Sequence, residues 1–138
     1  MVFGTFDLLH EGHLHLFKEA KKHGDFLVVV VARDTSVRKI KGFTPHQNEL
    51  QRLEKVKSCP IVNKALLGYE DDFYKVIEEH KPAVLCFGYD QDKQNIEAEL
   101  KNRKIKAEII TLTAFHPEKY KSSIMRQNKN YSKRNKLS

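Results

Sequence analysis

The sequence contains no long apolar run and no recognisable targeting segment. None of its apolar stretches reaches the roughly 18 residues that indicate a membrane-spanning helix. The N-terminus has no basic region followed by an apolar core and a cleavage site, which is the pattern of a secretory signal. We therefore expect a cytoplasmic protein that does not enter a membrane.

Cysteine is scarce, with only Cys59 and Cys86 among 138 residues. The two are far apart, no Cys-x-x-Cys pair occurs, and Cys86 lies within an apolar run. Such spacing provides neither a disulfide framework nor a cysteine-rich metal site. We expect both thiols to be reduced and to fill the core as small side chains.

Motifs for nucleic-acid binding are absent as well, both the aromatic pattern of an RNA-binding sheet and a DNA-binding helix motif. The formal net charge of +7 arises mostly at the C-terminus, where residues 126–138 include no acidic residue and five basic ones, Arg126, Lys129, Lys133, Arg134 and Lys136. We expect no nucleic-acid partner. The tail, residues 128–138, is either a solvated terminus or an arm that touches an anionic ligand or a neighbouring subunit.

Apolar runs alternate with helical patterns along residues 1–127, which predicts a single domain with a parallel sheet. The clearest strand, 26–32, is apolar without alternation, as expected for a strand covered on both faces. Further strands are predicted at 61–67, 83–87 and 107–112, and helices at about 12–23, 44–56, 71–80, 96–100 and 122–127. The pattern indicates a Rossmann-like, doubly wound α/β domain with five parallel strands and helices on both faces.

The helix periodicity also predicts which side chains face the core, namely Leu14, Phe17 and Ala20, then Leu50, Leu53 and Val56, then Phe73, Val76 and Ile77. Only three residues precede Gly4, although the first strand should be central and longer. Either the chain lacks a few native N-terminal residues, or this strand includes Thr5 and Phe6.

The most informative stretch, residues 4–13, reads Gly-Thr-Phe-Asp-Leu-Leu-His-Glu-Gly-His. Gly4 and Gly12 allow tight turns, and the helix that begins near Gly12 directs free N–H groups and its positive end toward the same space. His10 and His13 lie about one helical turn apart and should point the same way. This pattern is typical of phosphate binding. The alternatives are a zinc pair completed by Asp7 or Glu11, and two surface histidines without a role.

The same ten residues resemble the signature of the H-x-G-H nucleotidyltransferase superfamily, within its cytidylyltransferase-like family. The resemblance covers residues 1 to about 127. It is greatest to archaeal-type FAD synthases, with glycerol-3-phosphate cytidylyltransferase as a near relative. The tetrapeptide Gly88-Tyr89-Asp90-Gln91 resembles the FAD synthase turn more than the Gly-Asp-Asp-Trp turn of the glycerol-phosphate branch.

The resemblance implies an enzyme that transfers AMP from ATP to FMN and releases pyrophosphate. A cytidylyltransferase acting on glycerol 3-phosphate or another small phosphate is the first alternative, and a non-catalytic nucleotide-binding module is the second. The expected cofactor is a divalent cation, Mg²⁺, without a dedicated protein site, and a homodimer is compatible with the family. A tRNA synthetase fragment is disfavoured because no Lys-Met-Ser-Lys-Ser type loop is present.

The resemblance also implies roles for single residues. Catalysis is expected from His10, His13 and Lys41, and acceptor binding from Asp7, Lys39, Lys41 and Arg52. Nucleotide binding is expected from Gly4, Thr5, Phe6, His10, Glu11, Gly12, His13, Gly88, Asp90, Tyr120, Ser122 and Ser123.

Each of these roles has a plainer alternative. The lysines belong to a basic stretch, 38–42, that could be a solvated loop. Arg52 could form a surface salt bridge, and Asp90 or the two serines could simply cap helices. Pro117 to Tyr120 stand where the glycerol-phosphate branch has Arg-Thr-x-Gly, which puts that branch's substrate contacts in doubt.

Overall fold

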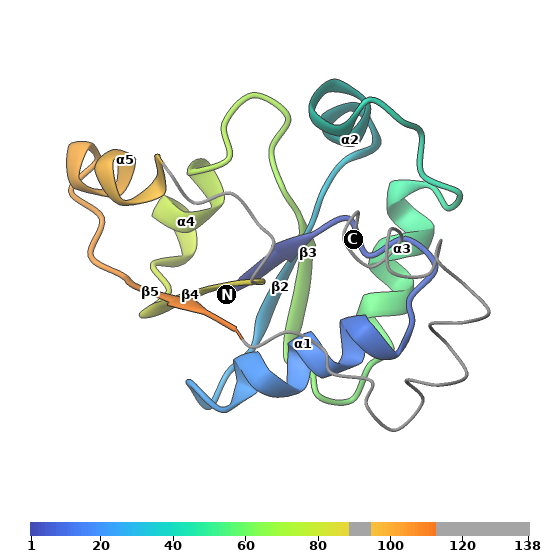
Figure 1. Ribbon diagram of the computed structural model, residues 1–138, viewed down its shortest axis with the longest axis horizontal. Coiled ribbons are helices and arrows are strands. Elements are labelled where there is room, and N and C mark those ends of the chain that lie inside the picture. The colour runs from blue at the N-terminus through green and yellow to red at the C-terminus, as the bar shows by residue number, and fades with distance from the viewer. Residues whose placement is uncertain (89–94, 113–138) are drawn as a thin grey trace, which may run out of the picture.

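The computed structural model describes residues 1–88 and 95–112, and these form an all-parallel sheet of five strands flanked by helices (Figure 1). The strands are β1 (Val2–Gly4), β2 (Val28–Val31), β3 (Lys64–Leu67), β4 (Val84–Phe87) and β5 (Glu108–Thr111). The helices are α1 (Glu11–Lys21), α2 (Asp34–Lys41), α3 (Glu49–Lys57), α4 (Lys75–His80) and α5 (Ile96–Asn102). The predicted fold class is confirmed.

The strand order is β3-β2-β1-β4-β5, so the chain builds outward from β1 in one direction and then returns to its other side. β1 pairs with β2 along its whole length, from Val2 opposite Val29 to Gly4 opposite Val31, and with β4 through Val2 and Cys86. The order therefore reverses between β1 and β4. In open parallel sheets, ligands bind outside the carboxyl ends of the strands at such a point.

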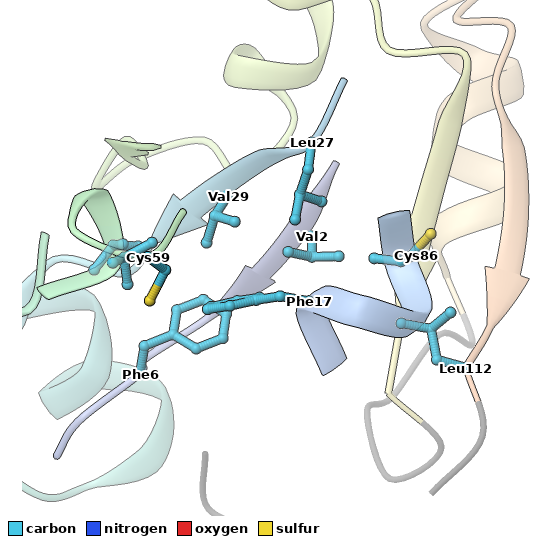
Figure 2. Close-up of a cluster of buried hydrophobic side chains, with 11 residues drawn as sticks. Val2, Phe6, Phe17, Leu27, Val29, Cys59, Cys86 and Leu112 are labelled. Atoms are coloured by element: carbon cyan, nitrogen blue, oxygen red, sulfur yellow. The ribbon is translucent and has the colours of Figure 1, made fainter. Parts of the chain in front are cut away.

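Two apolar layers cover the sheet. One packs Phe17 of α1 and Val56 of α3 against β1 and β2, and Figure 2 shows Phe17 facing Phe6 beside Val2 and Val29. The other layer packs α4 and α5 against the opposite face, through residues that include Val76, Ile77, Ile96 and Leu100. Cys59 and Cys86 are buried and free, as predicted.

One helix was not predicted. Residues 34–41, expected to be partly a basic loop, form α2, with Val37 buried and the other side mostly exposed. Gly42 ends this helix in the left-handed region, at φ 78°, where its amide donates to the carbonyls of Val37 and Arg38. Because glycine adopts this conformation without steric cost, it is a common helix terminator. The helix was not predicted because most residues of this stretch are charged or polar and only Val37 is buried.

The helix predicted to begin at Thr44-Pro45 begins instead at Glu49, and the prediction was wrong by about one turn. Asn48 caps it: its side chain accepts from the Gln51 amide, and the Gln51 side chain accepts from the Asn48 amide. This reciprocal capping satisfies two backbone donors that would otherwise lack partners.

Three side chains predicted to face the core are exposed instead, Leu14 (37%), Leu50 (63%) and Phe73 (41%). Phe73 is outside α4, which begins only at Lys75, so the helical periodicity did not apply to it. The remaining predicted inward residues of α1, α3 and α4 are buried or partly buried. The predicted helix at 122–127 lies outside the described residues.

In the part of the chain that the structure describes, no helix is both long enough and apolar enough to cross a membrane. A cavity of about 380 Å³ lies at the amino ends of β1, β2, β3 and β4, and Met1, Val28, Lys64 and Val84 are among its lining residues. It is therefore at the opposite edge of the sheet from the carboxyl ends, where the fold predicts a ligand.

Candidate active site

The N-terminus of α1 lies at the carboxyl end of β1, and His10 and His13 form its cap. The amide of Gly12 donates to Nδ1 of His10 at 3.0 Å, and the amide of His10 donates to Nδ1 of His13 at 3.1 Å. Histidines thus take the places that Ser or Thr and Glu or Gln usually hold in a capping box. Their rings stack, with centroids 3.8 Å apart and planes inclined by 24°.

This cap determines the tautomer of both rings. A backbone N–H can only donate, so each Nδ1 must be an unprotonated acceptor, and the proton of each neutral ring is on Nε2. His10 and His13 therefore present two Nε2–H donors from a single helix end. The α1 backbone dipole adds partial positive charge at the same place.

Burial keeps both imidazoles neutral. His13 is 3% exposed, and desolvation, together with the nearby His10 and Lys41, lowers its pKa to about 3. Desolvation also lowers the pKa of half-buried His10, which Glu11 partly offsets. His13 is deeper than His10, and within the described residues its buried Nε2 has no hydrogen-bond partner. A buried donor without an acceptor is costly, so this atom is suited to an anionic ligand oxygen.

The loop from β1 to α1 is held by Phe6, which is fully buried. Its ring contacts Phe17 in a tilted arrangement and His13 edge-on, with centroids 5.2 and 5.5 Å apart. Phe6 and Leu8 both have positive φ values, 55° and 50°, which is unusual for residues with side chains. The neighbouring core therefore maintains a backbone shape that brings His13 to the helix end.

The segment between α2 and α3 returns to this loop. Nζ of Lys41 donates to Oγ1 of Thr5 at 3.2 Å. The Asp7 carboxylate accepts from the amides of His46 and Gln47 and pairs with Nδ1 of His46 at 3.2 Å. Burial raises the pKa of Asp7, but these bonds outweigh it, and the net shift is downward. Lys41 therefore contacts the predicted site, whereas Asp7 is engaged in holding the segment in place.

Arg52 is fully buried, and protein acceptors surround its guanidinium. Its guanidinium donates to the carbonyls of Thr5 (2.8 Å), Ala32 (2.7 Å) and Gln47 (3.0 Å), and to the Asp34 carboxylate (2.6 Å). A surface salt bridge, the plainer alternative, is excluded. In this geometry Arg52 holds the backbone of Thr5.

The N-termini of α2 and α3 cap each other. The Asp34 amide donates to the Glu49 carboxylate, and the Glu49 amide donates to the Asp34 carboxylate. Arg33 adds a bond from Nη1 to Glu49 at 3.2 Å and one from Nε to the Gly68 carbonyl at 2.7 Å. These carboxylates therefore occupy the positive ends of α2 and α3, whereas the positive end of α1 carries the two neutral imidazoles.

The other predicted residues separate into two groups. Glu11 is exposed in the first turn of α1, Lys39 is exposed on α2, and Gly88 directly follows β4. Asp90, Tyr120, Ser122, Ser123 and the tail 128–138 lie outside the described residues. In residues 1–88 and 95–112, no three His, Cys, Asp or Glu side chains are grouped to hold a metal ion. Among these residues, the histidine pair thus lacks the third ligand that a zinc site requires.

Sequence reasoning missed four residues of this region: Asp34, His46, Gln47 and Glu49. Their partners are 15 to 40 residues away in the chain, and no local pattern marks such pairs. The helix register offers a signal for Arg52 but for none of these four, because Arg52 and Val56 are four residues apart and so share a face of α3.

Comparison with known proteins gives a consistent result. A model of the cytidylyltransferase-like family matches residues 1–128. An FAD synthase of Aciduliprofundum boonei is 44% identical over 117 residues, which cover 83% of this chain and 78% of that protein. An FAD synthase of Thermoplasma volcanium is 38% identical over 129 residues, covering 92% and 90%.

A solved structure is also similar, the lipopolysaccharide core biosynthesis protein from Thermoplasma volcanium GSS1. It superposes with a TM-score of 0.80 at 39% sequence identity, and the match covers 84% of this chain and 96% of that one. The match to the family model, residues 1–128, extends over the five strands and the histidine motif.

Proposed function

Because this chain belongs to the cytidylyltransferase-like family, we propose that it is an FAD synthase, which transfers AMP from ATP to FMN and releases pyrophosphate. Its relatives named FAD synthase, at 38 to 45% identity over most of the chain, support this assignment. The structural observation that carries it is the pair of Nε2–H donors of His10 and His13 at the N-terminus of α1.

The chemistry needs little more than such donors. The FMN phosphate is already anionic at neutral pH, and one of its oxygens attacks the α-phosphorus of ATP in line. The bond from that phosphorus to the β-phosphate oxygen breaks, and pyrophosphate leaves. No protein nucleophile or strong base is required, so the protein must chiefly align two polyanions and stabilise the charge that develops between them.

In this proposal His10 and His13 donate from Nε2 to the phosphate oxygens, and Lys41 adds a positive charge from the α2 side. Neutral donors suit the task because a preorganised N–H in a water-poor site stabilises developing charge without reorganisation. Thr5, which Lys41 contacts, serves the nucleotide. Lys39, which is exposed on the same helix, serves the acceptor as a weaker contact.

We further propose that Mg²⁺ arrives with ATP, which fits the absence of any group of three His, Cys, Asp or Glu side chains in residues 1–88 and 95–112. Asp7 is engaged by His46 and Gln47, and Asp34 by Arg52 and Glu49. Mg²⁺ is commonly held by substrate phosphates together with water and only one or two carboxylates. When bound, it neutralises part of the triphosphate charge.

The decisive experiment is a two-by-two assay of purified protein with Mg²⁺, in which ATP or CTP is combined with FMN or glycerol 3-phosphate. Chromatography separates FAD from CDP-glycerol, and a coupled assay measures pyrophosphate. We expect FAD from ATP plus FMN alone. If CDP-glycerol were the only product, the alternative substrate pair would be correct, and nucleotide binding without pyrophosphate would indicate a non-catalytic module.

A further inference from the structure

Three aromatic rings form a column beside β1, and the outermost of them is exposed. Phe87 and Phe3 stack with centroids 5.7 Å apart and planes inclined by 14°, and Phe3 meets Phe73 at 4.7 Å and 41°. Phe87 and Phe3 are buried, whereas Phe73 is 41% exposed. The column therefore leads from the core to the surface at the carboxyl edge of the sheet, where α4 begins.

The chain around Phe73 is fixed by specific contacts. The Asp72 carboxylate accepts from the Tyr74 amide at 3.0 Å and from Nη1 of Arg103 at 2.9 Å. Tyr74 contacts the Phe73 ring edge-on, with centroids 5.0 Å apart, and the Arg103 guanidinium lies over the Tyr74 ring. Phe73 is thus a rigid flat surface, and a ligand that stacks on it would lose little additional side-chain entropy.

The Phe73 ring is linked through β1 to the residues proposed to bind phosphate. Phe3, which supports Phe73, is two residues before Thr5, which contacts Lys41. Of the phenylalanine and tyrosine rings in the described ranges, only Phe26 and Phe73 are exposed, and Phe26 lines the cavity at the amino edge. The carboxyl edge therefore offers cationic and N–H donors together with one exposed flat apolar ring.

From this arrangement we infer that Phe73 is a specificity-determining residue that stacks against the isoalloxazine ring of FMN, an inference that rests on the proposed function. FMN has a phosphate at one end of a ribityl chain and a planar ring at the other. A site that begins at Lys41 and Thr5 and ends at Phe73 matches both ends. Aromatic stacking on a planar ligand is tolerant of its exact chemistry but requires a flat partner.

The first test measures FMN binding in the absence of ATP, with quenching of flavin fluorescence as the signal. The second measures the Michaelis constants for FMN and ATP in the FAD assay. Phe73→Leu keeps an apolar side chain on Phe3 but removes the flat ring, and it should raise the FMN dissociation constant about tenfold or more. The constant for ATP should stay within about twofold. Phe26→Leu, the matched control at the amino edge, should leave both constants unchanged.

A second variant keeps the ring and reports on it directly. The chain has no tryptophan, so Phe73→Trp introduces its only indole. This variant should bind FMN at least as tightly as the parent, and stoichiometric FMN should quench the indole emission more strongly than in Phe26→Trp. Thermal unfolding of each variant separates lost binding from lost folding.

The inference is overturned if Phe73→Leu makes FAD with the parent constant for FMN, or if the ATP constant rises instead. It is equally overturned if Phe73→Trp makes FAD while its indole is quenched no more than that of Phe26→Trp. In all these cases the proposed function stands. If the parent protein neither binds FMN nor makes FAD, the proposed function itself fails, and the two failures are therefore distinguishable.

Discussion

The ring of Phe6 lies against Gly4, so that a Cβ added at residue 4 would be 2.7 Å from Cζ of Phe6. Real Cβ atoms essentially never approach so closely, and Phe6 is fully buried and cannot move aside cheaply. We predict that Gly4→Ala lowers the free energy of unfolding by about 1–3 kcal/mol, as overpacking does. Because the Phe6 ring also contacts His13, FAD formation should fall as well.

A second glycine provides the control. Gly24 has no atom within 4 Å of an added Cβ and no positive φ. Gly24→Ala should therefore be neutral or slightly stabilising, by up to about 1 kcal/mol, because it reduces the freedom of the unfolded chain. Urea denaturation of the two variants makes the comparison, and equal stability of Gly4→Ala and the parent would contradict the packing argument.

His10 combines two roles that substitution can separate. Asparagine is a strong N-cap, and its side-chain oxygen can accept the Gly12 amide in place of Nδ1, but it lacks the Nε2–H donor. His10→Asn should therefore unfold like the parent while its turnover falls roughly 100-fold or more. His10→Gln carries an amide donor closer to the Nε2 position, and it should be less stable, by about 1 kcal/mol, yet more active than His10→Asn.

Parent-like turnover of His10→Asn would show that His10 only caps α1. Steady-state kinetics and thermal unfolding on the same preparations decide this. His10→Ala removes both the cap and the donor, so it should combine the two losses and serves as the reference for each.

The fold class and the proximity of the two histidines could be predicted from the sequence, because both depend on local patterns. Apolar runs of the sheet and the spacing of His10 and His13 are read over a few residues. The pairing of Asp7 with His46 crosses 39 positions of the chain, and no periodicity or motif records it. Such contacts arise only once β1 and the segment after α2 are brought to the same edge.

Helix α3 shows a second limit. Its hydrophobicity pattern predicted Leu50 in the core, yet Leu50 is 63% exposed and Arg52 is fully buried. The inversion has a physical reason, because three carbonyls and one carboxylate converge there and need donors. Arginine supplies five N–H groups in one rigid plane, whereas leucine supplies none. The need of these buried acceptors for N–H donors therefore determined which α3 side chain is buried, against the hydrophobic periodicity.

Titration of His13 should appear in the acid stability of the protein. Its pKa is about 3 in the folded state, well below the ordinary value of 6.5. Between these two pH values the unfolded chain binds a proton at His13 and the folded chain does not. Stability from this residue is therefore fully present above pH 6.5 and is lost as the pH falls toward 3. At pH 5 the loss is about 2 kcal/mol, set mainly by the unfolded pKa.

The variant His13→Asn isolates this contribution, since its oxygen can still accept the His10 amide while no ring titrates. The difference in unfolding free energy between pH 7 and pH 5 should be smaller in the variant by about 2 kcal/mol. Urea denaturation at the two pH values measures it. Parallel pH profiles for parent and variant would mean that His13 is not held neutral.

Arg52 allows direct ligand contact to be distinguished from positioning. Arg52→Lys keeps the charge but cannot reach the carbonyls of Thr5, Ala32 and Gln47 together, so buried acceptors lose their partners. Truncating one member of such a buried network costs about 3–5 kcal/mol. Arg38→Lys, on the exposed side of α2, is the matched control and should change stability by less than about 0.5 kcal/mol.

If Arg52 positions Thr5, the urea midpoint of Arg52→Lys falls strongly and kcat falls with it, because Lys41 no longer meets Thr5 correctly. If Arg52 instead binds the acceptor phosphate, the Michaelis constant for FMN rises while stability stays near that of Arg38→Lys. The four short contacts of its guanidinium favour the first result.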